Sequence, residues 1–101
     1  MDAAVREART ALAMQDYELI AEGLVCDGAR IAAVVRRRDE VVAIVRHQGV
    51  PAPAEQRALS RALMAFLTAR RVSEVYARFD VVWLEDGRPM LLADAFLFEP
   101  R

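Results

Sequence analysis

The spacing of hydrophobic and polar positions divides the chain into helical and extended segments. Residues 2–15 place Val5, Ala8 and Leu12 at intervals of three and four among charged side chains, which predicts an amphipathic helix. Segments rich in Val, Ile and Leu follow and predict a meander of three strands, over residues 17–25, 29–37 and 41–47.

The residues between these segments support the same division. Asp27-Gly28 predicts a tight hairpin turn, because both residue types tolerate positive φ angles, and the charged triplet 38–40 predicts a second turn. Pro51 and Pro53 interrupt the extended pattern. A second amphipathic helix is predicted beyond them over residues 54–70, and two strands joined by a turn at 85–87 are predicted over residues 76–84 and 90–98.

The order of these elements predicts one α/β domain over residues 1–101 with a mixed central sheet, because 101 residues leave room for one core. The formal net charge of −1 gives no overall attraction to nucleic acid, so any such contact must come from a local patch. A single cysteine, Cys26, and the absence of a long apolar run predict a cytoplasmic protein that does not enter a membrane.

Several sequence segments, in this order, carry a family resemblance. They are Tyr17-Glu18-Leu19-Ile20, the glycine turn at Gly28, the segment from Glu55 to Ala62, Arg78-Phe79-Asp80-Val81-Val82 and Asp94-Ala95-Phe96. With them the chain resembles the YraN family of small bacterial proteins. The resemblance implies the α-β-β-β-α-β core of restriction-endonuclease-like and Holliday-junction-resolvase-like nucleases.

The resemblance also implies a metal site, and this chain departs from it. In the family, acids on the second and third strands bind a divalent cation, which lowers the pKa of bound water. At the aligned positions stand Arg30, Ala32 and Ile44, and Arg46 replaces the lysine. Since arginine stays protonated, Arg46 does not replace a proton-shuttling amine. We therefore expect no catalytic residue, no metal and no cofactor.

Arg30 and Arg46 lie on one predicted face, and Gln56, which matches the helical glutamine of the family, is expected above them. Guanidinium forks match phosphate and carboxylate, so these residues form a candidate contact site for an anion or nucleic acid. The alternative is that both arginines form structural ion pairs with Glu18, Asp27 or Glu55.

Arg36 and Arg37 form a second candidate contact for phosphate, within the basic cluster 36–38. Because Asp39 and Glu40 follow directly, the alternative is a solvated turn whose charges balance.

The favoured hypothesis is a catalytically inactive relative of nucleases that associates with nucleic acid or with a protein partner. A metal-dependent nuclease with relocated ligands, drawn from Asp27, Asp39, Glu40 and Asp80, is a second hypothesis. A structural dimerisation domain is the third. The apolar segment 90–98 predicts a homodimer through the C-terminal strands, since an exposed edge strand of this composition needs a cover.

Overall fold

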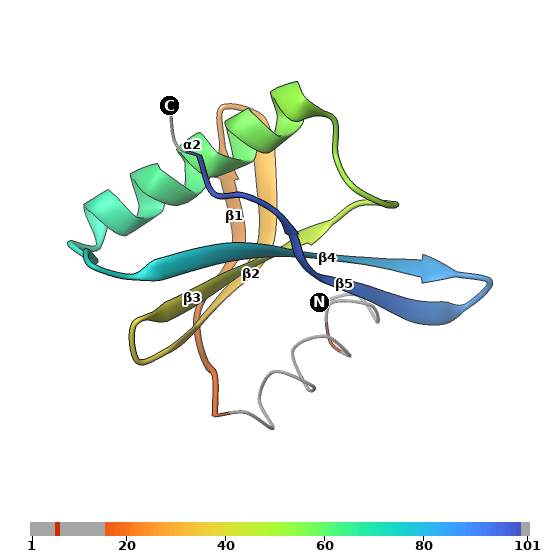
Figure 1. The fold of residues 1–101 in the computed structure, drawn as a ribbon, viewed down its shortest axis with the longest axis horizontal. Helices are drawn as coiled ribbons and strands as arrows, with labels where there is room; N and C mark the ends of the chain where they lie inside the picture. The colour runs from red at the N-terminus through yellow and green to blue at the C-terminus, as the bar shows by residue number, and fades with distance from the viewer. Residues whose placement is uncertain (1–5, 7–15, 100–101) are drawn as a thin grey trace.

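The computed structural model describes Arg6 and residues 16–99, which form a mixed α/β fold (Figure 1). Within residues 16–99, five strands make one sheet in the order β1-β2-β3-β4-β5, with one helix, α2, against it. The elements are β1 (Glu18–Cys26), β2 (Ala29–Arg37), β3 (Glu40–Arg46), α2 (Pro53–Ala69), β4 (Tyr76–Glu85) and β5 (Arg88–Phe96). The predicted helix over residues 2–15 lies, apart from Arg6, outside the described residues.

Local turn chemistry explains the antiparallel pairs. Asp27 and Gly28 adopt φ angles of 48° and 80° between β1 and β2, and Asp86 and Gly87 adopt 49° and 76° between β4 and β5. Two consecutive residues with positive φ match the right-handed twist of paired strands, which is why Asp-Gly favours this turn. Both hairpins predicted from the sequence are confirmed by the antiparallel pairing of β1 with β2 and of β4 with β5.

Helix α2 connects β3 to β4 and makes these two strands parallel, with Glu40 opposite Tyr76 and Arg46 opposite Val82. Pro53 is favoured in the first turn, where a missing backbone N–H costs nothing. The helix ends at Ala69, and the next residue but one, Arg71, has a φ of 56° that turns the chain toward β4.

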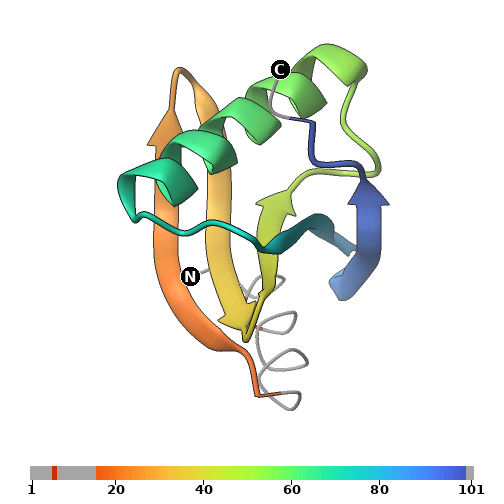
Figure 2. The same ribbon diagram turned by 60° about the vertical axis from the view of Figure 1, so that its left-hand side comes forward.

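The two faces of the sheet bury different sets of side chains. Facing α2, buried residues of all the strands from β2 to β5 pack with Leu59, Leu63 and Leu67 of the helix, and Phe79 stacks on Phe96 with ring centroids 4.5 Å apart. Figure 2 shows α2 lying across this face. The opposite face has its own buried cluster, formed by Tyr17, Ala33, Val35, Val42, Ile44 and Val82.

The bounds of β2 match the sequence-based prediction, and those of the other described elements differ from it by one or two residues. Glu40 was expected in a turn, but it is the first residue of β3, where its backbone lies opposite Tyr76. The last strand ends at Phe96 rather than Phe98, after a register shift that includes Asp94 at a φ of 52°. Within the part of the chain that the structure describes, no helix is long and apolar enough to cross a membrane.

Candidate functional site

Arg30 and Arg46 line one pocket of about 380 Å³ on the sheet, together with Gly23 to Val25, Ile31 and Ala32. Both arginines are exposed. None of the described residues that line this pocket carries a carboxylate. Two guanidinium groups from different strands therefore line the same open pocket.

The neighbouring core residues show that these two side chains lie on one face of the sheet. Ala29 and Ile31 belong to the cluster under α2, so Arg30 between them points to the other face of β2. Val45 belongs to the same cluster, and the next residue, Arg46, likewise faces away from the helix. Strict alternation along β2 would not give this result: Ile31 and Val34, three positions apart, both belong to the cluster under α2, so alternation is broken between them.

Gln56 does not join this pocket, contrary to the expectation that it lies above the two arginines. It sits in the first turn of α2, on the opposite side of the sheet, and lines a separate pocket with Ser60 and Phe96. Its Nε2 donates a hydrogen bond of 2.7 Å to the carbonyl oxygen of Pro51. Gln56 therefore closes the loop that precedes the helix.

The structural ion pairs considered as the alternative for Arg30 are not formed within the described chain. Glu55, one of the three candidate acids, lies 3.4 Å from Nε2 of His47 through its Oε2, and His47 Nδ1 lies 3.0 Å from the Gly49 carbonyl oxygen. Arg30 makes no ion pair with any described residue. Its guanidinium is consequently available to a ligand.

Arg36 and Arg37 lie elsewhere, in a cleft of about 630 Å³ at the β2–β3 turn. Nε of Arg36 donates a hydrogen bond of 2.6 Å to the Arg38 carbonyl oxygen, and Arg37 lies 3.3 Å from Oε2 of Glu40. Three arginines and four acids line the cleft: Asp16, Glu18, Arg36, Arg37, Arg38, Asp39 and Glu40. The positive charge is balanced locally, which makes this cleft a poorer phosphate contact than the Arg30–Arg46 pocket.

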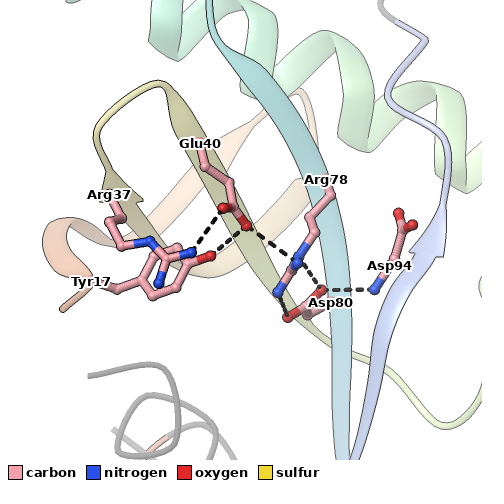
Figure 3. Close-up of polar contacts among 6 residues, drawn as sticks. All are labelled: Tyr17, Arg37, Glu40, Arg78, Asp80 and Asp94. Carbon is pink, nitrogen blue, oxygen red and sulfur yellow. Dashed lines mark hydrogen bonds and ion pairs between the residues drawn. The ribbon is translucent and has the colours of Figure 1, made fainter. Parts of the chain in front are cut away.

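Beside this cleft, a chain of polar contacts crosses the face opposite α2 (Figure 3). The Tyr17 hydroxyl donates to Oε1 of Glu40, and the same oxygen lies 3.2 Å from Nη1 of Arg78. Arg78 in turn donates through Nε to Oδ1 of Asp80 over 3.2 Å. We call Tyr17, Glu40, Arg78 and Asp80 the cross-strand network.

Asp80 is the buried end of the cross-strand network, with no exposed surface. It accepts hydrogen bonds from Nε and Nη2 of Arg78, at 3.2 and 3.4 Å, and from the backbone N–H of Asp94 at 2.8 Å. A buried carboxylate is tolerated only when paired and hydrogen-bonded, and these three donors meet that requirement.

The network perturbs the acidity of its members in a consistent way. The pKa of Glu40 is held below 4.5, first by the hydrogen bond from Tyr17 and then by Arg78 and Arg37, which together outweigh its burial. Burial, followed by the Glu40 carboxylate, raises the pKa of Tyr17 above 10.0. Burial opposes the charge on Arg78, but Asp80, Tyr17 and Glu40 outweigh it and raise the Arg78 pKa. At neutral pH the network therefore holds a neutral phenol and a charged guanidinium between carboxylates.

The same geometry bears on metal binding. Ile44, at the position where the sequence resemblance implies an acid, is fully buried and lies opposite Asp80 of the adjacent strand β4. Asp80 and Glu40, two acids considered as relocated ligands, both contact the Arg78 guanidinium, so a cation already occupies the space between them. Among the described residues, no three His, Cys, Asp or Glu side chains gather as a set that can hold a metal ion.

Sequence reasoning placed Asp80 in the resemblance segment Arg78-Phe79-Asp80-Val81-Val82 and among the possible relocated ligands, and predicted no contact between Asp80 and Arg78. The available signal was their spacing: residues two apart on a strand share a face, and Arg78 and Asp80 are opposite charges at that spacing in β4. What the sequence did not provide was that β4 lies directly beside β3, which brings Glu40 within reach of Arg78.

In comparisons with known proteins, no family model matches this chain and no curated protein matches it either.

Proposed function

We propose that this chain is a non-catalytic module with a restriction-endonuclease-like core, related to the YraN family, that binds nucleic-acid phosphates through Arg30 and Arg46. The observation that carries the proposal is the pocket on the face opposite α2, where two arginines from neighbouring strands meet with no acid among the described lining residues. Paired guanidinium groups bind phosphate oxygens in a bidentate geometry.

The arrangement of elements supports the nuclease-like core. Three antiparallel strands, then a helix, then a strand parallel to the third follow one another in the described chain. This is the β-β-β-α-β part of the order that the family resemblance implies. Two of the three positions where the resemblance places metal acids, Arg30 and Ala32, line the proposed phosphate pocket, together with Arg46 at the lysine position.

The side chains that replace the acids support binding without catalysis. Arg30 puts positive charge where a nuclease needs negative charge to hold a cation, and Arg46 keeps the positive charge of the lysine position. Ile44 contributes only apolar surface to the core at the third position. A pocket of this composition attracts the phosphate backbone directly instead of through a metal.

The decisive experiment measures binding of a fluorescent DNA duplex and of the corresponding single strand by anisotropy, across a range of salt concentrations. The variant Arg30→Ala/Arg46→Ala is compared with Arg57→Ala/Arg61→Ala, which removes two exposed arginines from α2 and changes the net charge equally. We expect the first variant to lose about two units of the salt slope, since each phosphate contact contributes about 0.9, and the second to keep the wild-type slope. Equal losses in the two variants, or no wild-type binding at low salt, would refute the phosphate site.

A parallel assay tests the non-catalytic part. Plasmid DNA incubated with purified protein and Mg²⁺ or Mn²⁺ is expected to remain intact. Cleavage that a chelator abolishes and that Arg30→Ala/Arg46→Ala leaves unchanged would instead support the hypothesis of a nuclease with relocated ligands.

A further inference from the structure

The outer edge of β5 is exposed, and its residues Met90, Leu91 and Leu92 are apolar. Among residues 16–99, β5 is the last strand of the sheet and pairs with β4 alone. Side chains on both of its faces are exposed, and so is the neighbouring tip of β4: Leu84, Met90, Leu91 and Leu92 have exposed fractions of 37–44%. Figure 1 shows this hairpin extending beyond the other strands.

The other edge of the sheet does not have this character. β1 carries a register shift between Leu19 and Ala21, and Gly23 adopts a φ of 62°. Two of its exposed positions, Glu18 and Glu22, are acidic. Bulges and charges of this kind discourage edge-to-edge pairing. β5 has a bulge of its own beyond Leu92 and charges at Arg88 and Asp94, but the segment from Met90 to Leu92 has neither, which makes it the part of the sheet edge open to a further strand.

The register of the hairpin determines which backbone groups of β5 are free. The turn closes on Glu85 and Arg88, and in such a hairpin that pair exchanges both hydrogen bonds, after which bonded and non-bonded pairs alternate. Leu91, opposite Val82, is therefore a non-bonded position, so its N–H and C=O point away from β4. On one side of Leu91, Pro89 lacks an N–H and cannot donate to a further strand. On the other side, the register shift begins beyond Leu92. The segment with free backbone groups and regular geometry therefore centres on Leu91.

We propose that β5 pairs antiparallel with β5 of a second copy of this chain, about a two-fold axis through Leu91. In this register the two Leu91 residues exchange their free N–H and C=O groups, and Met90 lies opposite Leu92 of the second copy. A two-fold interface of this kind is self-complementary, because the same segment supplies both sides.

Charge complementarity supports this register. Pairing about Leu91 brings Arg88 of each copy toward Asp94 of the other, since both lie three residues from the axis, although the bulge between Leu92 and Phe96 takes Asp94 out of the regular register. Both side chains are exposed, and neither makes an ion pair with a described residue. The Asp94 carboxylate points away from Asp80, while its backbone N–H serves the cross-strand network (Figure 3). Oppositely charged residues directly across a strand pair attract, and like charges repel.

The test uses charge exchange followed by sedimentation velocity of the full chain between about 1 and 100 µM. Arg88→Asp alone places two acids opposite each other at both ends of the interface, and Asp94→Arg alone places two arginines there. We expect each single variant to weaken the dimer by about tenfold or more. An equimolar mixture of the two variants restores opposite charges at both ends and is expected to form a heterodimer.

Three outcomes would overturn the proposal: a monomeric wild type over the whole concentration range, single variants that dimerise like the wild type, or a mixture that does not associate. The control is Val50→Asp, which adds an acid at a half-exposed apolar residue far from β5 in the sequence and is expected to leave the dimer intact.

Because Asp94 has positive φ and its replacement can affect folding, a second measurement tests the register independently. In a Cys26→Ala background, a mixture of Met90→Cys and Leu92→Cys places one thiol of each copy across a non-bonded strand pair, with Cα atoms about 4.5 Å apart, which a disulfide can span. Met90→Cys alone places its two thiols in a diagonal relation, with Cα atoms about 8 Å apart, beyond disulfide reach. Mild oxidation is expected to cross-link the mixture and not Met90→Cys alone, and equal cross-linking of both would refute this register.

Discussion

Removing Arg78 should cost more stability than removing Arg37, although both arginines contact Glu40. Arg78→Met leaves the fully buried Asp80 carboxylate with the Asp94 N–H as its remaining donor among the described contacts. Breaking a buried ion pair by removing one partner costs about 3–5 kcal/mol. Because 31% of the Arg78 side chain is exposed and water can partly replace it, we expect the lower end, about 3 kcal/mol.

Arg37→Met is the matched control, because it removes the same type of side chain from the same acid. Arg37 and Glu40 are 39% and 28% exposed, so their pair contributes at most about 1 kcal/mol. The contact of the Arg37 guanidinium with the Tyr17 ring, at 4.7 Å, adds about 0.5–1 kcal/mol. The expected loss for Arg37→Met is thus at most about 2 kcal/mol, below that for Arg78→Met.

Urea denaturation followed by circular dichroism measures both losses as changes in the free energy of unfolding. The double variant Arg78→Met/Asp80→Leu completes a thermodynamic cycle with the two single variants. It should cost at least about 1.5 kcal/mol less than the sum of the singles, because the charge that lacked a partner is gone. The reasoning fails if Arg78→Met and Arg37→Met destabilise equally, or if the singles are additive in the double variant.

Two further predictions concern the same face of the sheet. Since the folded-state pKa of Glu40 lies below its ordinary 4.5, its contribution to stability is complete above that pH and is lost as the pH falls through the lowered value. Tyr17→Phe removes the largest cause of the shift, so the free energy of unfolding, titrated from about pH 7 to 3, should fall less steeply than in the wild type, and an unchanged slope would contradict this origin. Ile44→Ala should cost about 2–5 kcal/mol in urea denaturation because Ile44 is fully buried, whereas Val50→Ala at a half-exposed loop position should change stability by less than about 0.5 kcal/mol.

Local signals in the sequence were sufficient for the individual elements. The spacing of Leu59, Leu63 and Phe66 predicted helix α2, and Asp27-Gly28 and Asp86-Gly87 predicted the two hairpins, because each signal acts within a few residues. The common face of Arg30 and Arg46 is a different case, because it depends on the break in alternation between Ile31 and Val34, which strict alternation does not predict.

Relations between distant segments were less accessible. The position of Gln56 depends on which face of the sheet α2 covers, and no pattern within the helix reveals that choice. The contact of Glu40 with Arg78 depends on the parallel pairing of β3 with β4, which joins residues 36 positions apart, as in Glu40 and Tyr76. Local sequence patterns do not determine which distant strands become neighbours, so the contacts of the cross-strand network could not be predicted from the sequence.

The parallel pairing of β3 with β4 divides the sheet into two units that differ in how they assemble. β1 to β3 and the β4–β5 hairpin each close through turns of two residues, whereas joining them requires the ordering of α2 and its flanking loops. Strand pairs joined by short turns form early because their loop-closure entropy is small, and closing a long connection is slower. The β3–β4 pair, which includes Glu40, is therefore expected to form last. During refolding, hydrogen exchange should show the β3–β4 amides gaining protection after those of the hairpins.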